Sequence, residues 1–414
     1  MKLNIDLHIH SRFSIGVSKD MTVKNLAKWA PYKGLQAIGC GDCLHSTWLE
    51  EVTSLEEVDE GTYELDKTRF FLTCEVEDSS RVHHILMFPS KSAVEVFRAK
   101  VARHCKNLAS DGRPRLHMNG IEIAQAAVDA DALFGPAHAF TPWTAIYAAH
   151  DSLASCYGDL ASRVTFVELG LSADSDYADR ISELHPLTFL TNSDAHGPKP
   201  NRIAREFVRF DTKANTATEV MMALKRERGR KPVLNVGVPP ELGKYNESGC
   251  IKCFTHYTLT EASFQKWKCK KCGKRIKKGV WDRVNELADL DEPRHPDHRP
   301  PYQHIIPLAE IVAQAMDKGV NTKGVTKEWS KLIEIFKDEV NILVDAPISD
   351  VLEVAQAEVG KAIEAFREGT IVVYPGAGGD YGKIAIPKPG EVLPRPKPKV
   401  AGKVKGGQYK LTDF

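Results

Sequence analysis

The placement of histidines and carboxylates relative to the apolar segments is the feature that most constrains this sequence. Short apolar runs with strand character alternate with segments of helical periodicity through about residue 230, and ionisable residues stand at the ends of several runs. Repeated strand–helix units of this length predict a parallel α/β sheet or barrel. Because the carboxyl ends of parallel strands meet on one face, we expect these residues to converge there.

The residues at these strand ends have the chemistry of metal ligands. His8 and His10 are two apart, so on a strand they point the same way and can bind one ion, and the same holds for Asp194 and His196. Imidazoles mixed with carboxylates suit zinc, manganese or iron. Two such ions roughly 4 Å apart suit phosphoester hydrolysis. The other members of the predicted cluster are Asp42, Glu75, His83 or His84, and His138.

The cysteines predict a second, structural metal site. Four of the nine form two close pairs, separated by fifteen residues, with the spacing of a four-cysteine zinc ribbon: Cys250, Cys253, Cys269 and Cys272. Because so small a module lacks an apolar core, the zinc would supply its folding energy. We expect the module to present cations to a nucleic-acid backbone, although a purely structural strut is the alternative. The predicted DNA-binding residues are Lys268, Lys270, Lys271, Lys274, Arg275, Lys277 and Lys278.

The charge is uneven along the chain and indicates a polyanionic partner. The net charge is only +1, yet residues 266–283 hold nine lysines and arginines against one acid, and residues 383–410 hold eight against one. We expect four regions: a phosphoesterase domain over 1–235, the zinc ribbon over 245–292, a helical DNA-binding domain over 302–370 and a flexible basic tail over 375–414. Pro293–Pro301 is a linker by composition. With no apolar run near the ~20 residues of a membrane span and no signal-peptide pattern at the start, we expect a cytoplasmic protein with no membrane partner.

Several motifs in residues 1–210 are specific in combination: Asp6-Leu-His-Ile-His-Ser, Glu75, the Val-His-His-Ile-Leu run, Gly-Pro-Ala-His138 and Asn192-Ser-Asp-Ala-His196. Together they resemble the polymerase-and-histidinol-phosphatase (PHP) superfamily. The resemblance implies a distorted seven-stranded β/α barrel with two or three catalytic divalent metals, here zinc, manganese or magnesium. It implies that Glu75, Asp194 and His196 are catalytic. It also implies one ion on His8, His10, Glu75 and Asp194, a second on Glu75, His84 and His138, and a third on His196, with Asp42 among the ligands.

Two features bear on this assignment. His84 is preferred to His83 because the family's ligand directly precedes the apolar run, although periodicity alone does not choose between neighbours. The family often has Thr-Asp-His where this chain has Gly41-Asp42-Cys43, which leaves the third metal site open.

The order of barrel, zinc ribbon and helical domain resembles the endonuclease Q family along essentially the whole chain. The resemblance implies hydrolysis of the phosphodiester on the 5′ side of uracil, hypoxanthine, xanthine or an abasic site, in double-stranded or single-stranded DNA. A damaged nucleotide turned out of the helix would need a pocket near the metals. The candidate pocket loops are residues 110–114, 140–147 and 170–177.

The final residues resemble the short peptide that docks on the sliding clamp PCNA. The pattern consists of Gln408, Leu411 and Phe414, at the end of the basic stretch. Two rival functions remain at this stage. One is a PHP phosphoesterase acting on a small phosphate monoester, which would need neither the ribbon nor the basic stretches. The other is a clamp-tethered DNA-binding adaptor with a degenerate barrel, against which the near-complete ligand set argues.

Overall fold

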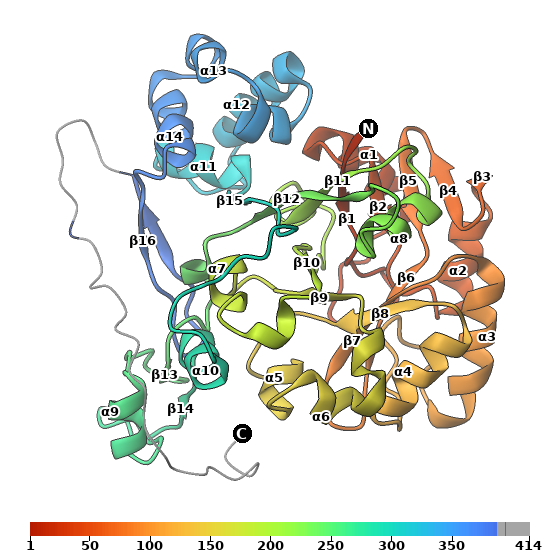
Figure 1. The fold of residues 1–414 in the computed structure, drawn as a ribbon. Helices are drawn as coiled ribbons and strands as arrows, with labels where there is room; N and C mark the ends of the chain where they lie inside the picture. Colours follow the sequence, from red (N-terminus) through yellow and green to blue (C-terminus); the bar gives the residue numbers. More distant parts are fainter. Residues whose placement is uncertain (387–393, 395–414) are drawn as a thin grey trace.

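The computed structural model describes residues 1–386 and Pro394. Residues 1–237 form an α/β domain (Figure 1). Its strands are β1 (Lys2–Asp6), β2 (Ala37–Gly39), β3 (Glu56–Asp59), β4 (Thr62–Leu65), β5 (Thr68–Phe71), β6 (Thr73–Glu77), β7 (His83–Met87), β8 (Leu133–Pro136), β9 (Phe166–Glu168), β10 (Thr188–Leu190), β11 (Phe207–Asp211) and β12 (Lys231–Gly237). Its helices are α1 (Val23–Lys33), α2 (Ser46–Thr53), α3 (Lys91–Val101), α4 (Gly120–Asp129), α5 (Ile146–Ala149), α6 (Leu153–Tyr157), α7 (Ser175–Ala178) and α8 (Ala217–Leu224).

The strands of this domain fall into three sheets. One of them also includes the later strand β15 (Tyr302–His304) and has the order β15-β12-β11-β1-β2-β5-β4-β3. A second has the order β6-β7-β8, and a third joins β9 to β10. β1 pairs in parallel with β2 and antiparallel with β11. The α/β class is therefore confirmed, whereas the strand pairing of the described residues does not close into one seven-stranded barrel.

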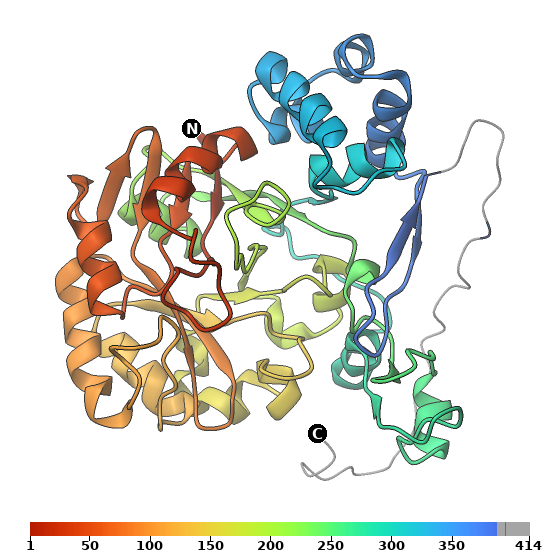
Figure 2. The same ribbon diagram turned by 180° about the vertical axis from the view of Figure 1, so that it is seen from behind.

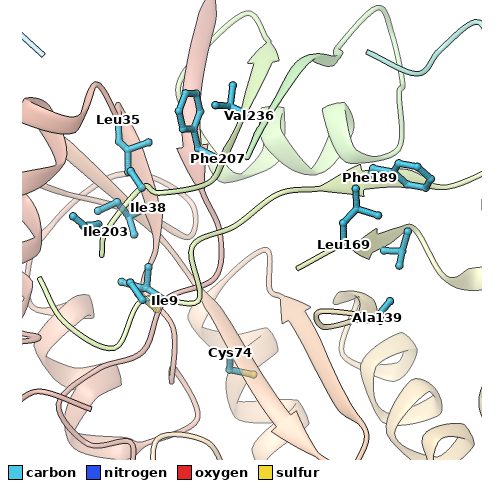
Figure 3. Close-up of a cluster of buried hydrophobic side chains, with 14 of the residues drawn as sticks. Ile9, Leu35, Ile38, Cys74, Ala139, Leu169, Phe189, Ile203, Phe207 and Val236 are labelled. Carbon is cyan, nitrogen blue, oxygen red and sulfur yellow. The ribbon is translucent and has the colours of Figure 1, made fainter. Parts of the chain in front are cut away.

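Alternation along β1 explains how the sheet holds both a core and a site. Leu3, Ile5 and Leu7 are buried in a cluster that also contains residues of α8. Because side chains alternate along a strand, the even-numbered residues point to the opposite face. Just after the strand, His8 and His10 continue this even-numbered series. A larger apolar cluster extends from the interior of the α/β domain into the helical region, and Figure 3 shows part of it.

The remaining elements lie along one side of the α/β domain. The ribbon contains β13 (Gly249–Cys250), α9 (Leu259–Phe264) and β14 (Ile276–Lys277), and α10 (Val280–Leu287) follows it. The helical domain lies at the other end of this side, and a hairpin runs between the two (Figures 1 and 2). The helices of this domain and the strands of the hairpin are α11 (Leu308–Ala315), α12 (Lys323–Phe336), α13 (Ile348–Val354), α14 (Ala357–Arg367), β16 (Val372–Tyr374) and β17 (Lys383–Ala385).

The predicted linker 293–301 is fastened to the α/β domain. The guanidinium of Arg299 is buried, pairs with Asp179 at 2.9 Å and lies 3.1 Å from the centre of the Phe189 ring. β15 (Tyr302–His304) then joins the main sheet beside β12. The composition predicted a linker, but the buried ion pair and the added strand attach this segment to the α/β domain.

The helical domain is held by a second buried ion pair. Lys33, at the end of α1, pairs with Glu339 and donates to the carbonyl of Pro200 at 2.6 Å. Glu339 also accepts from the indole of Trp329 at 2.7 Å. Removing one partner of such a pair is costly because the other charge stays buried, so these contacts fix the domain on the α/β unit.

The structure also differs from the predicted tail. Residues 375–382 connect β16 and β17 and contact the segment before the ribbon, where Gly376 donates to the carbonyl of Glu241 at 2.8 Å. Residues 375–385, which we expected to belong to a flexible tail, instead belong to this hairpin. The predicted clamp-binding residues Gln408, Leu411 and Phe414 lie outside the described residues. None of the helices in the described part of the chain is long and apolar enough to cross a membrane.

Candidate metal centre and its cleft

Four predicted ligands converge at one point of the α/β domain. The Nε2 atom of His10 lies 3.3 Å from an oxygen of Glu75 and 3.3 Å from Oδ1 of Asp194. The Nε2 atom of His8 lies 3.7 and 3.8 Å from the same two carboxylates. Ligand atoms around a tetrahedral zinc ion with bonds of about 2.0–2.1 Å are about 3.3–3.5 Å apart. The spacing therefore fits one divalent ion.

Unpaired polar atoms support this fit. In the described residues, Nε2 of His8, Nε2 of His10 and Oδ1 of Asp194 are buried without a hydrogen-bond partner. Buried polar groups are normally hydrogen-bonded or coordinate a metal. Three such atoms facing one another are the donor set that a cation would satisfy.

Two carboxylates hold the imidazoles in place. Both oxygens of Glu168 lie 3.0 Å from Nδ1 of His8. Asp42 lies 3.0 Å from Nδ1 of His10 and accepts from the backbone of Ser11 at 2.6 Å. A carboxylate bonded to Nδ1 fixes the tautomer and leaves Nε2 for the metal.

Asp42 therefore does not occupy the ligand position predicted for it. It lies behind His10, and no group of ligand atoms in the described residues includes it. Sequence analysis missed Glu168, although this residue ends β9, and a carboxylate at the end of a strand was the signal used for the other ligands.

The second predicted metal group requires a correction. His83, rather than His84, lies with Glu75 and His138: Nδ1 of His83 is 2.7 Å from Glu75, and Nε2 of His138 is 2.9 Å from it. Glu77 holds the other nitrogen of His83 at 3.2 Å. The reason is strand alternation: on β6 and β7, Glu77 pairs with His83, and His84 faces the opposite side of the sheet.

A third group shares residues with the first. Nδ1 of His196 lies 3.6 Å from Asp194, and ligand atoms of His10, Asp194 and His196 lie within 4.8 Å of one another. His196 is about one-third exposed, so it borders the cleft rather than the core.

The backbone is strained at this centre. Asp42, His138 and Asp194 have φ values of +53°, +28° and +46°, in the left-handed region that non-glycine residues seldom adopt. Such strain costs of order 1–3 kcal/mol per residue and concentrates at functional sites. Gly170 accommodates the turn at His138, because a Cβ atom on it would lie 2.7 Å from that of His138.

Electrostatics tie the imidazoles and carboxylates together. Burial by itself would lower the pKa of His8. The facing charges of Glu168 and Glu75 raise it by more than burial lowers it, so the pKa of His8 is well above its usual value. Burial raises the pKa of Glu75, but His83 and His8 lower it to well below its usual range. Glu75 thus stays ionised, because the positive charges of the neighbouring imidazoles stabilise its carboxylate.

The metal centre opens into a cleft of about 830 Å³. Arg113 lies in it, 3.3 Å from Glu75 and about one-quarter exposed. Further cations and partly or fully exposed aromatic rings line the same space. They are Lys199, Arg202, Arg205, Lys244, Trp143, Tyr245 and Tyr381. Parts of all three predicted pocket loops line the cleft: Arg113, residues 141–144 and residues 170–172.

The ribbon cysteines cluster as predicted. The Sγ atoms of Cys250 and Cys272 are 3.4 Å apart, and those of Cys253 and Cys269 are 3.5 Å apart. Four sulfurs around a tetrahedral zinc ion lie about 3.8 Å apart, so the group fits a zinc ion with little adjustment. The hydroxyl of Tyr257 donates to Sγ of Cys269 at 3.2 Å and is the main cause that lowers the pKa of this thiol to about 6.

The predicted DNA-binding cations of the ribbon separate into two groups. Lys268, Lys270, Lys271, Lys274 and Arg275 are exposed. Lys277 is instead buried against the Trp143 ring, with its Nζ 3.7 Å from the ring centre, and Lys278 pairs with Glu286 at 2.7 Å. These two join the ribbon to its surroundings.

Together the fold and the cysteine cluster define a class of α/β proteins that carry a four-cysteine module between an α/β domain and a helical domain. Two solved structures match at a TM-score of 0.90 with 47% identity. One is the lesion-specific endonuclease PfuEndoQ from Pyrococcus furiosus, with 94% of this chain and 96% of that chain covered. The other is endonuclease Q in complex with a 27-mer duplex substrate that has an abasic lesion at the active site, with 94% and 98% covered.

Sequence relatives cover different lengths. The chain is 33% identical to the uncharacterized protein YqxK of Bacillus subtilis over 92% of this chain and 99% of that protein. It is 43% identical over 61% of its length to the uncharacterized protein MJ0043 of Methanocaldococcus jannaschii, but covers only 32% of that protein. Residues 307–370 match the family described as the MJ0043 C-terminal domain. The chain belongs to the endonuclease Q family.

Proposed function

We propose that this protein is a metal-dependent, lesion-specific DNA endonuclease. It hydrolyses the phosphodiester on the 5′ side of deaminated bases (uracil, hypoxanthine, xanthine) and of abasic sites, in DNA repair. The observation that carries the proposal is the likeness, over nearly the whole chain, to an endonuclease Q whose active site holds an abasic lesion in a duplex.

The metals would be held by two overlapping groups of residues. His8, His10, Glu75 and Asp194 would bind one ion, and Glu75, His83 and His138 a second, with Glu75 shared. His196, beside Asp194, would serve a third ion or the reacting groups directly. Bound divalent ions would supply the charge that activates a water molecule and stabilises the phosphoryl oxygens.

Arg113 would bind the scissile phosphate. Its guanidinium contacts Glu75 and lines the cleft. The loop that carries Arg113 contacts the segment after β1, where the backbone of Gly112 donates to the carbonyl of Phe13 at 3.1 Å. With the charge of Glu75 neutralised by a bound metal, the guanidinium of Arg113 would be available to pair with a phosphate instead. Arginine suits this role because its planar fork matches two phosphate oxygens.

The aromatic side of the cleft would receive an extruded nucleotide. Trp143 and Tyr381 are 43% and 57% exposed, and Lys244 lies 5.4 and 5.8 Å from the rings of Tyr245 and Tyr381. Exposed rings next to cations form a platform on which bases stack. Base flipping into such a pocket would bring the sugar–phosphate backbone toward Asp194.

Two further elements would bind the substrate and a partner. The five exposed cations of the ribbon would follow the DNA backbone, and the zinc on its cysteines would hold the module folded. From sequence alone, Gln408, Leu411 and Phe414 would dock on the sliding clamp PCNA.

A nicking assay tests the proposal. End-labelled duplexes carrying one uracil, hypoxanthine, xanthine or abasic site would be incubated with manganese, magnesium or zinc, and with a chelator. We expect one metal-dependent product that ends just 5′ of the lesion. Cleavage of none of the lesions, with phosphate released from small monoesters, would instead support the rival phosphatase.

Asp194→Asn provides the matched loss of function. Mutating a residue that only hydrogen-bonds to a metal ligand typically lowers metal affinity or activity by about 10–100-fold. Losing the ligand Asp194 itself should therefore slow nicking by at least about 100-fold, while DNA binding survives. Asp20, another carboxylate that lines the cleft, belongs to none of the ligand groups in the described residues, so Asp20→Asn should cleave at close to the wild-type rate. Equal rates for the two variants would contradict the assigned centre.

A further inference from the structure

A buried cluster of ligand-type side chains lies outside the cleft. In the part of the chain that the structure describes, five groups of at least three His, Cys, Asp or Glu residues bring their ligand atoms within 4.8 Å of one another. Four belong to the metal centre and the ribbon. The fifth consists of Asp78, His84 and Cys156, which are between 0 and 3% exposed. His84 is the residue that the sequence placed in the catalytic centre and the structure does not.

The imidazole of His84 is oriented as those of the predicted metal ligands are. Its Nδ1 atom lies 2.8 Å from the hydroxyl of Tyr157, and its Nε2 atom faces Oδ2 of Asp78 at 3.4 Å. A partner on one ring nitrogen that leaves the other for a metal is the usual arrangement of a ligating histidine. His8 and His10 show the same arrangement.

The separation of 3.4 Å is informative. It exceeds the 2.7–3.2 Å of an ordinary N–H···O hydrogen bond. It matches the roughly 3.3–3.5 Å between two ligand atoms of a tetrahedral zinc ion. The spacing of Asp78 and His84 is therefore that of two ligand atoms on one cation, as well as that of a long hydrogen bond.

The local backbone also positions the other two side chains, Asp78 and Cys156. One oxygen of Asp78 accepts from the backbone of Ser80 at 2.7 Å and Val82 at 2.8 Å, which leaves the second oxygen facing His84. Gly120, the first residue of α4, makes room for Cys156, because a Cβ atom there would lie 2.6 Å from its Sγ atom. The backbone around the cluster therefore fixes the carboxylate and leaves space for the sulfur.

We propose that Asp78, His84 and Cys156 bind a structural zinc ion, separate from the ribbon zinc and the catalytic metals. One thiolate, one carboxylate and one neutral imidazole neutralise a divalent ion, so the buried site carries no net charge. The thiolate makes the set too soft for magnesium or manganese and favours zinc. On binding, the thiol of Cys156 gives up its proton to solvent and its sulfur bonds to the metal.

The consequence would be a cross-link within the wall of the α/β domain. The three ligands come from the turn after β6, from β7 and from α6. His83 lies next to His84 on β7 and faces the metal centre. Zinc at this cluster would thus stiffen the strand that presents a catalytic ligand, without taking part in the reaction.

The decisive experiment locates zinc directly. Crystals of the full chain, purified with no added metal, would be measured on both sides of the zinc absorption edge. We expect an anomalous peak among Asp78, His84 and Cys156 in addition to the ribbon peak. A peak at the ribbon with none at this cluster would overturn the proposal and leave a hydrogen-bonded triad, in which Tyr157 donates to His84 and His84 donates to Asp78.

A solution measurement gives an independent answer. Cys156→Ser should lower the zinc content by about one ion per chain and reduce thiolate-to-cobalt charge-transfer absorption of the cobalt-loaded protein by about one part in five. The matched control is Cys105→Ser, since Cys105 is half-buried and outside the ligand groups. Equal zinc content in wild type and Cys156→Ser would refute the site. If Cys156→Ser does not fold, the crystallographic measurement on the wild type still decides.

Discussion

Glu168 offers a sharp test of how the metal centre is built, because it touches ligands without belonging to any ligand group. Its carboxylate lies 3.0 Å from Nδ1 of His8 and accepts from the backbone of His138 and the amide of Asn192, both at 2.8 Å. Glu168→Gln keeps the shape of the side chain but removes the charge. The new amide side chain would also place an N–H group where the carboxylate now accepts, facing one of its three present partners: His8, His138 or Asn192.

The expected magnitude follows from these contacts. Loss of a partner behind a metal ligand costs about 10–100-fold in metal affinity, which corresponds to about 1.4–2.8 kcal/mol. Three contacts depend on the Glu168 carboxylate, so we expect the upper part of this range. The concentration of manganese that gives half-maximal nicking should rise accordingly, while cleavage at saturating metal falls less.

The assay is a metal titration of nicking on a duplex with one abasic site, checked by calorimetric manganese binding to chelator-treated protein. Glu183→Gln is the matched control, because Glu183 accepts from Tyr147 at 2.7 Å and from the backbone of Leu153 at 3.0 Å, among residues outside the ligand groups. An unchanged manganese requirement in Glu168→Gln would refute the role given to this carboxylate.

Two further predictions concern the cations of the ribbon. Lys270→Ala should lower the slope of log Kd for DNA against log salt concentration by about 1. Lys278→Ala should change this slope less, because the ammonium of Lys278 already pairs with Glu286. Equal effects of the two variants would refute the division of the ribbon cations into two groups. Burial, and to a smaller extent the charge of Arg275, lowers the pKa of Lys277 from 10.5 to about 8. The charged form of Lys277 should therefore destabilise the folded protein below pH 8. The folded protein then binds fewer protons than the unfolded one between these values, so the free energy of unfolding rises with pH from 8 to 10.5. Chemical denaturation of Lys277→Met should lack this rise, and a rise that persists in the variant would assign it to other groups.

Local sequence patterns were sufficient for several features. The pairs His8/His10 and Asp194/His196 were predicted to lie together because residues two apart share one face of a strand, whatever the rest of the chain does. The clustering of the four cysteines was predicted from their spacing, since the cysteine pairs of a four-cysteine zinc site stand at fixed spacings. The α/β class followed from the alternation of strand-like and helical segments.

Other assignments needed the neighbours of each strand. Choosing His83 over His84 requires knowing which face of β7 meets Glu75, and a shift of one residue in strand register exchanges the two faces. Asp42 stands at a strand end like a ligand, yet the backbone N–H of Ser11 and the ring of His10 hold it one layer behind the metal position.

The sequence by itself determined which residue types form the centre, the cysteine module and the order of the domains, because these depend on spacing along the chain. The tertiary structure alone decided which nitrogen of each histidine faces the centre, since that choice belongs to partners such as Glu168, 160 positions away from His8. It also decided that Arg299 attaches a proline-rich segment to the α/β domain and that Tyr381, near the end of the described chain, lines the cleft. Such contacts depend on loop closure over long separations, for which the pattern of neighbouring residues carries no signal.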